Sequence, residues 1–587
     1  MTRNAHVSRS RVSVRLALLM AAAMVLVACG GDDDDRSADT NSPASEAPSA
    51  PSTEATASPT NPETDATTAP TEPGADATTA PTEPGTDATT APTEPATQTT
   101  VPAAEPVSGG TLTMLNQTEA ASLDPALFRT SITGTRGDGA VGFALYGALV
   151  LDNPVTGEVD MSMAESVTSP DGVVWTLKLR EGLVFSNGSP FDAEAVKLNW
   201  ERYGAPDSTS GAAAQARAMA SIEVIDPLTV EVTLARPNGQ WPRTLALYPL
   251  NFIAAPESWL NGNPDEQPIG AGPFTLVEWV RDDHLTLERN PTYFDAPRPY
   301  VDELVIRPIT DGRQRYNAMQ TGQGQMSYNS IDFQIIAEAE EAGYGVYPTP
   351  LSGGQIFLFN TARPPFDDVR VRRAIQLGLD RNELNDLVQR GQADVFSTLA
   401  AEGTPFYEPS ITLPEPDPAE AQRLIDEVVA EQGGPITFTI LTNPQSQANV
   451  EGILTLLSQY DGLEIGVQSV ASPATEVVPG NFDMSVWGLF FIDPEPRMYD
   501  LMHSASAGNW GKYSNPEVDA ALDIARVSQD PAERAEAYAT VQQILVDEAP
   551  FIAPWRVPNS LMFDDTVHQV ETFGDGVILL DRVWLSE

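Results

Sequence analysis

The chain has 587 residues, and its 33 Lys and Arg against 82 Asp and Glu give a formal net charge of −49. Such an excess of negative charge disfavours nonspecific binding to nucleic acid or to an anionic membrane surface. One Cys and four His residues are too few for a Cys/His zinc cage, an iron–sulfur cluster or a disulfide framework within the chain. We therefore expect no metal and no cofactor, while 41% hydrophobic residues predict a large folded core.

The first 28 residues have the pattern of a secretion signal. Arginines between Arg3 and Arg15 precede an apolar run from Leu16 to Ala28, which is too short to span a bilayer comfortably. The run ends in Leu26-Val-Ala-Cys29-Gly30, which resembles the bacterial lipobox, where the cysteine is diacylated and becomes the first mature residue. We expect residues 1–28 to be removed and Cys29 to carry a lipid anchor, because two or three acyl chains hold a protein on a membrane. The alternative is an ordinary cysteine at the end of a signal.

Residues 29–107 predict a disordered linker. Ala, Thr, Pro, Glu, Ser and Asp dominate this stretch, so burial of apolar surface cannot offset the entropy of ordering it. An 11-residue repeat begins at Asp65, Asp76 and Asp87, but it has no hydrophobic face on which repeats could stack. We interpret it as a stiffened spacer of on the order of 240 Å if fully extended, or about 50 Å as a coil.

The periodic pattern of a folded α/β region begins after Ser108. Alternating segments such as Thr111–Leu115 and Val173–Leu179 predict strands, and those between Gln355 and Leu441 alternate with predicted helices. Each helix start carries an Asp or Asn whose side chain can accept from the free amide groups of the first turn. The predicted caps are Asp192, Asp380, Asp417, Asn515 and Asp530. This order predicts an α/β architecture in at least two lobes.

Several short motifs in the same order resemble the family 5 extracellular solute-binding proteins of ABC importers, the oligopeptide, dipeptide and nickel receptor family. The matching stretches include Gly110-Thr-Leu-Thr, Ser122-Leu-Asp-Pro125, Trp175-Thr-Leu-Lys-Leu-Arg-Glu-Gly182, Phe185-Ser-Asn-Gly188, Gly270-Ala-Gly-Pro-Phe274, Arg289-Asn-Pro-Thr-Tyr293, Pro364-Pro-Phe-Asp-Asp-Val-Arg and Tyr513-Ser-Asn-Pro-Glu. The resemblance spans nearly all of residues 108–587.

The resemblance implies a two-lobed, type II periplasmic-binding-protein-like fold with an extra subdomain and no catalytic step. Lobe I is expected at 108–352 and 559–587, with the subdomain at about 148–269, and lobe II at 353–558. Hinge closure around a solute between the lobes would signal occupancy to the permease and ATPase subunits of an importer. We expect a monomer held at the extracytoplasmic face of the cell membrane, with a peptide or peptide-like solute as its ligand.

A stretch in lobe II marks where the ligand would lie. In the family's peptide receptors, a tryptophan is followed three residues later by an aspartate that holds the ligand's terminal ammonium. The matching run is Trp487-Gly488-Leu-Phe490-Phe-Ile-Asp493-Pro494, so Phe490 stands at the ammonium-binding position. A buried ammonium without a carboxylate costs several kcal/mol. The departure favours an apolar, sugar-like or blocked ligand stacked on aromatic rings; the alternative is that Phe490 packs in the core.

Other candidate ligand contacts lie near the ends of predicted strands, which face the crevice in α/β folds. They are Gln355, Trp510, Asn116 and Glu119, the last as a possible substitute anchor together with Asp124 or Asp493. An aspartate before a proline is more often a turn residue, which favours that role for Asp124 and Asp493.

Two other classes of function compete with an importer subunit. A surface hydrolase is disfavoured because the sequence has no Gly-x-Ser-x-Gly, His-Glu-x-x-His or phosphate-loop motif. The carboxylate pairs Asp367-Asp368 and Asp564-Asp565 are interpreted as solvated surface. The same fold binding a non-peptide ligand, such as an oligosaccharide, a metal chelate or another apolar or blocked solute, as an importer subunit or a sensor is the other alternative.

Overall fold

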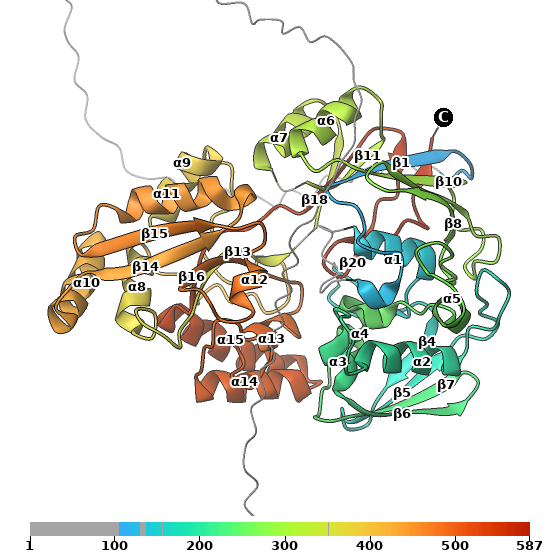
Figure 1. Ribbon diagram of the computed structural model, residues 1–587, viewed down its shortest axis with the longest axis horizontal. Helices are drawn as coiled ribbons and strands as arrows, with labels where there is room; N and C mark the ends of the chain where they lie inside the picture. The colour runs from blue at the N-terminus through green and yellow to red at the C-terminus, as the bar shows by residue number, and fades with distance from the viewer. Residues whose placement is uncertain (1–104, 129–136, 155, 331, 350, 587) are drawn as a thin grey trace, which may run out of the picture. The chain divides into compact units, whose positions relative to one another are not determined.

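The computed structural model describes residues 105–128, 137–154, 156–330, 332–349 and 351–586. The predicted signal, the predicted lipidation site Cys29 and the linker repeats lie outside the described residues. Within the described ranges, no helix has both the length and the apolar character that a membrane crossing requires. We use the names lobe I, subdomain and lobe II for the regions built around the three largest sheets (Figure 1).

Lobe I is built on a seven-stranded sheet with strand order β12-β18-β11-β1-β10-β9-β8. Successive side chains of β1 point to opposite faces of this sheet. Leu112 and Met114 belong to the larger hydrophobic cluster around α1, and Leu115 belongs to a smaller cluster with α6 and α7. The elements are β1 (Thr111–Asn116), β8 (Phe274–Val280), β9 (His284–Arg289), β10 (Glu303–Pro308), β11 (Met326–Ser330), β12 (Gly345–Pro348), β18 (Ser560–Phe563), η1 (Pro125–Leu127), α1 (Asp138–Tyr146), α6 (Gly312–Gln320) and α7 (Phe333–Glu341). Two short pairs complete it: β19 (Val567–His568) with β22 (Trp584–Leu585), and β20 (Thr572–Phe573) with β21 (Val577–Ile578).

The subdomain has its own four-stranded antiparallel sheet, ordered β4-β5-β7-β6, and its own hydrophobic cluster. Trp175, expected in the core, is 3% exposed there. The elements are β2 (Val150–Asp152), β3 (Val159–Met161), β4 (Ala164–Thr168), β5 (Val174–Leu179), β6 (Met219–Asp226), β7 (Thr229–Leu234), α2 (Ala193–Gly204), α3 (Ala213–Arg217), α4 (Trp241–Leu247), η3 (Pro249–Asn251) and α5 (Pro256–Leu260).

Lobe II is built on a five-stranded sheet, ordered β15-β14-β16-β13-β17, with a hydrophobic cluster on each face. Helices α8, α10 and α11 contribute to the cluster on one face, and α13, α14 and α15 to the other. The elements are β13 (Ser352–Phe359), β14 (Ile436–Thr442), β15 (Leu463–Ser469), β16 (Met484–Phe491), β17 (Phe551–Trp555), α8 (Val369–Gly378), α9 (Arg381–Gln389), α10 (Pro418–Gln432), η4 (Pro444–Ser446), α11 (Gln447–Leu457), α12 (Ala474–Val477), α13 (Arg497–Met502), α14 (Pro516–Val527) and α15 (Pro531–Glu548).

The chain passes twice between the two large sheets. Strand β12 of lobe I ends at Pro348 and β13 of lobe II begins at Ser352; β17 ends at Trp555 and β18 returns to lobe I at Ser560. The predicted helix caps are confirmed, because all five side chains accept from amide groups of the first turn. Both crossings are short, so two polypeptide segments join lobes that otherwise carry separate cores.

Candidate functional site

Strands β13 and β16 carry a small open surface at one end of the lobe II sheet. They pair antiparallel, with Gln355 opposite Gly488 and Gly353 opposite Phe490, so these four positions share one face of the sheet. Gly488 is exposed and Phe490 is half-buried; Phe490 belongs to none of the hydrophobic clusters found in the described residues. This placement does not support the alternative in which Phe490 packs in the core.

Glycine at position 488 makes room for the ring of Phe490. A Cβ atom on Gly488 would come within 2.6 Å of Cε2 of Phe490, which is far inside van der Waals contact. Across the pair, Gly353 has a φ of +72°, and a Cβ there would meet the carbonyl oxygen of Leu489 at 1.8 Å. The ring of Phe490 therefore occupies the space that a side chain at position 488 would need.

A chain of neutral hydrogen bonds fixes Gln355 beside this surface. Its Nε2 donates to Oγ of Ser446 (3.0 Å), and its Oε1 accepts from Nδ2 of Asn449 (2.7 Å). Asn449 in turn accepts from Nε2 of Gln389 (3.2 Å). Ser446 and Asn449 were not predicted from the sequence, although the Asn443-Pro444 turn before α11 indicates a strand end of the kind that predicted Gln355.

The two predicted tryptophans lie against a different part of lobe II. Trp487 precedes Gly488 on β16 and so points to the opposite face of the sheet, where it packs against the cluster that includes α14 and α15. Trp510 is half-buried and packs against the same cluster. The structure therefore separates the predicted set into one group with Gly488, Phe490 and Gln355 and another with Trp487 and Trp510.

Asp493 is part of a buried ionic cluster. It is 3% exposed; its Oδ1 accepts from Nη2 of Arg534 at 2.6 Å, and its Oδ2 lies 3.5 Å from Nε of Arg243 in α4 of the subdomain. Arg243 also pairs with Asp152 at the end of β2. Both carboxylate oxygens of Asp493 are therefore engaged by arginines, which is a structural arrangement.

Burial and ion pairing shift the pKa values of the acids of this region in opposite directions. Burial acts to raise the pKa of Asp493, but Arg243 and Arg534 together lower it below its usual value. Burial raises the pKa of Asp152 to about 7 against the opposing effect of Arg243. It also raises the pKa of Glu495, which is 0% exposed, to about 7 against the effect of Arg526.

The lobe I candidates have different surroundings. Asn116 ends β1, is buried, and its Oδ1 accepts no hydrogen bond within the described part of the chain. Glu119 accepts from Nε1 of Trp279 (2.8 Å) and from the backbone amide of Asp282 (3.2 Å), and it lies 3.6 Å from Arg281. Glu119 thus ties the loop after β1 to the β8–β9 hairpin.

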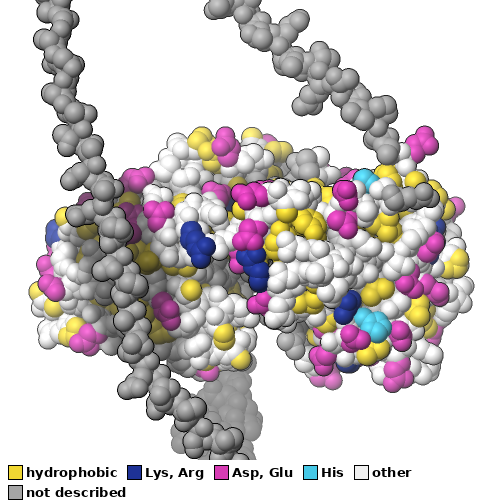
Figure 2. Space-filling model, turned by 90° about the horizontal axis from the view of Figure 1, so that it is seen from above, with side chains coloured by type: hydrophobic (Ala, Val, Ile, Leu, Met, Phe, Trp, Pro, Cys, Tyr) yellow, Lys and Arg dark blue, Asp and Glu magenta, His cyan; other side chains and the backbone are white. Residues whose placement is uncertain are grey.

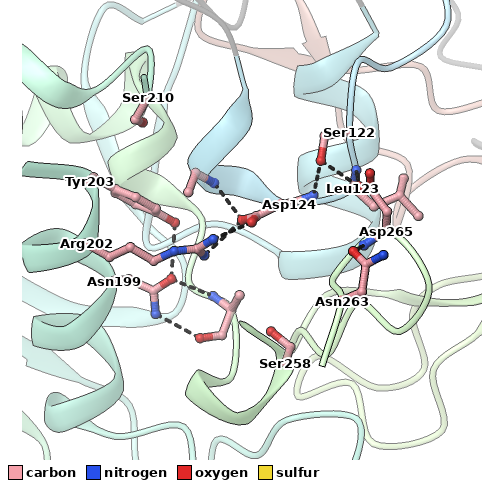
Figure 3. Close-up of polar contacts among 12 residues, drawn as sticks. Ser122, Leu123, Asp124, Asn199, Arg202, Tyr203, Ser210, Ser258, Asn263 and Asp265 are labelled. Atoms are coloured by element: carbon pink, nitrogen blue, oxygen red, sulfur yellow. Dashed lines mark hydrogen bonds and ion pairs between the residues drawn. The ribbon is translucent and has the colours of Figure 1, made fainter. Parts of the chain in front are cut away.

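The Ser122-Leu-Asp-Pro125 motif joins this loop to the subdomain (Figure 3). Asp124 caps η1 by accepting from the amide of Ala126 and pairs with Arg202 of α2, including a 3.0 Å contact to Nη1. Asp265 accepts from both Oγ of Ser122 (2.6 Å) and the amide of Leu123 (2.7 Å). Asp124 is therefore a turn residue, as predicted, and its charge is matched inside the protein.

Neither surface charge nor metal-ligating side chains add a residue to the candidate ligand contacts in the part of the chain that the structure describes. On the face shown in Figure 2, Asp and Glu side chains are scattered among neutral ones and Lys and Arg form no extended patch. The described residues contain no group of three or more His, Cys, Asp or Glu side chains placed to hold a metal ion. Asp368 and Asp564, one from each carboxylate pair, accept from backbone amides of Arg370 and Thr566, which are turn and cap contacts.

Two α/β lobes joined by two short crossings, with a subdomain in the first, define a two-lobed binding protein of the type II periplasmic class. Residues 158–510 match the family model described as bacterial extracellular solute-binding proteins, family 5 Middle. The chain belongs to this family. The glutathione-binding protein GsiB of Salmonella paratyphi A is 28% identical over 420 residues, which cover 66% of this chain and 79% of the relative.

Solved structures show the same fold. The binding protein DppA from Helicobacter pylori, in complex with the peptide STSA, superposes with a TM-score of 0.72 at 23% identity and covers 82% of this chain and 99% of its own. AgaA from A. tumefaciens R10, in complex with agropinic acid, has a TM-score of 0.70 at 22% identity and covers 81% and 99%. The fold class predicted from the sequence is confirmed.

Proposed function

We propose that the chain is the solute receptor of an ABC importer and takes up a peptide or peptide-like molecule without altering it. The observation that carries the proposal is the β13/β16 surface near the first crossing. There, exposed Gly488, half-buried Gln355 and Phe490, and buried Gly353 share one face of the sheet. The names of the related proteins, which bind glutathione or a peptide, support a solute of this size. Permease and ATPase subunits are its proposed partners, and the receptor acts as a monomer.

We further propose that the solute has no free ammonium group at the Phe490 position. The surface offers an aromatic ring, a glutamine amide and backbone groups, and the nearest aspartate along the chain, Asp493, has both oxygens engaged by arginines. An ammonium desolvated against a ring alone keeps only a cation–π contact of about 2 kcal/mol. Ligand contact is therefore assigned to Gln355, Gly488 and Phe490. Trp487, Trp510 and Asn116 stay candidates that lie apart from this surface, and Asp493 and Glu119 support the structure.

The test compares trialanine with N-acetyl-trialanine amide by calorimetric titration. Wild-type protein should bind the blocked peptide more tightly than the free one. Phe490→Asp should raise the affinity ratio of free to blocked peptide at least tenfold, since it supplies a carboxylate to the ammonium. Phe490→Asn, which is polar but uncharged, is the matched control and should not change that preference. Tight, amine-dependent binding to wild type would refute this solute class.

A non-peptide solute is the second candidate. It is favoured by the neighbour AgaA, whose complex with agropinic acid shows that this fold holds ligands other than peptides. Binding of neither trialanine form, together with a co-purified molecule that contains no amide-linked residues, would favour this candidate over the first.

The lipid anchor is proposed from the sequence alone. The Leu26-Val-Ala-Cys29 motif follows directly after an apolar run, and Cys29 is the chain's one cysteine. Cys29→Ser should move the protein from the membrane fraction to the soluble fraction of lysed cells. A variant that stays in the membrane fraction would remove the lipid argument.

A further inference from the structure

The subdomain and lobe II meet through a contact that sequence analysis did not predict. We call it the closure contact: residues 239–248 of the subdomain against residues 493–500 and 526–528 of lobe II. The amide of Gly239 donates to the carbonyl oxygen of Arg526, and Nε2 of Gln240 donates to that of Ser528, both at 2.9 Å. In Figure 1, α4 of the subdomain lies beside α13 and α14 of lobe II.

Charged and polar side chains extend the closure contact. The hydroxyl of Tyr248 donates to Oδ2 of Asp500 at 2.8 Å, and the guanidinium of Arg497 lies 5.4 Å from the centre of the Tyr248 ring. Arg243 lies against Asp493, as described above. The residues involved come from segments 250 to 288 positions apart in the sequence, so the contact depends on how the lobes are placed and not on local folding.

Three charges of the closure contact, those of Arg243, Asp493 and Asp500, are also paired within their own regions. Arg243 has Asp152 inside the subdomain, while Asp493 has Arg534 and Asp500 has Arg526 inside lobe II. These three ions therefore keep a partner when the lobes separate, which avoids the large penalty of an unpaired buried charge. Arg497 differs, because its ion pair, 2.8 Å to Asp575 of lobe I, itself spans the lobes. A contact of this kind can form and break, unlike a hydrophobic interface that would leave a core exposed.

At Gly239 the backbones of the two surfaces approach closely. A Cβ atom on Gly239 would lie 2.3 Å from the carbonyl oxygen and 3.0 Å from the carbonyl carbon of Val527, both backbone atoms of lobe II. Its φ is outside the left-handed region, so alanine fits its backbone conformation. The glycine is therefore required by the approach of lobe II and not by the fold of the subdomain.

We propose that the closure contact positions lobe II against the subdomain without the help of solute, and that Gly239 is the residue that permits it. Solute affinity then depends on residues that never touch the solute, because the apparent dissociation constant scales inversely with the population of the binding-competent arrangement. Weakening this contact shifts the receptor toward separated lobes.

The test is a distance measurement between spin labels in the absence of solute. Labels on Glu223→Cys of β6 and Ser458→Cys after α11, both exposed positions, report the separation of the two regions in the full-length chain carrying Cys29→Ser. Gly239→Ala should move the distance distribution to longer values and broaden it. Gly434→Ala is the matched control, because a Cβ there meets no atom within 4 Å and its φ is not left-handed.

A second variant keeps the test decisive if Gly239→Ala fails to fold. Tyr248→Phe removes only the hydroxyl that donates to Asp500 and should produce a smaller shift in the same direction. The proposal is overturned if the folded variants keep the wild-type distance distribution. Because no solute is used, this result is independent of which solute the receptor takes.

Discussion

The end of β16 and the segment directly after it make contrasting use of charge. Up to Phe490 this face, exposed at Gly488, carries glycines, a phenylalanine and a glutamine held by neutral partners. In the segment after it, the buried acids Asp493 and Glu495 and the half-buried Arg497 are each engaged by an opposite charge. In this region ionic groups stabilise the architecture, and the open surface is left neutral. A charged residue in a predicted site is therefore weak evidence of ligand contact.

The largest effect is expected from substitution of Asp493, in the ionic segment. Asp493→Ala should lower the free energy of unfolding by about 3–5 kcal/mol, because it leaves Arg534 and Arg243 buried with less compensation. Urea unfolding followed by fluorescence measures this change. Asp367→Ala, at an exposed aspartate, is the control and should alter stability by less than about 0.5 kcal/mol. Equal, small effects of the two substitutions would contradict the structural role of Asp493.

Protonation of Glu495 should make the stability of the protein depend on pH. It faces Arg526, Asp500 and Asp493; Oε1 pairs with Arg526, and Oε2 has no partner within the described residues. Burial raises its pKa from 4.5 to about 7, so the folded state holds a proton that the unfolded state has lost between these values. Stability should therefore fall as pH rises through this window, by up to about 3 kcal/mol, and stay level above it.

The Glu495→Gln variant isolates the contribution of Glu495 to the pH dependence of stability. The pKa of Asp152 is also raised to about 7, so Asp152 adds a second decrease of stability over much of the same pH window. The measured quantity is therefore the difference between the stability–pH profiles of wild type and Glu495→Gln. The variant should lose less stability than wild type between pH 5 and pH 8 in urea titrations. Parallel profiles would show that Glu495 is ionised in the folded protein throughout.

The smallest expected effect concerns the neutral surface. Gly488→Ala should displace the Phe490 ring and weaken binding of N-acetyl-trialanine amide about tenfold, with little change in stability. The same substitution in a Phe490→Ala background should have almost no further effect, because the ring it displaces is gone. Additive losses in this cycle would mean that Gly488 acts independently of Phe490.

Local rules predicted much of the fold. The caps at Asp192, Asp417 and Asp530 follow from side-chain hydrogen bonds within one helical turn, and the alternation of β5 and β7 from burial of one face. Asp124 before Pro125 was predicted as a turn residue for the same local reason, and the structure confirms it. Such features depend on residues close together in the chain.

The site was harder to predict because it depends on long-range placement. Strand alternation alone could have separated Trp487 from Gly488 and Phe490, since neighbouring residues of a strand face opposite sides. No local pattern indicates that Arg243 reaches Asp493, or that Trp279 and Arg281 engage Glu119. These partners lie more than 150 residues apart, and only the folded structure brings them together.

The most direct test of the account is mass spectrometry of the molecule released when the purified protein, isolated from its own cells, is denatured. We predict one small solute, released unchanged, without a free terminal ammonium group. A free-amine peptide held in stoichiometric amount, or a product formed from an added solute, would contradict the account.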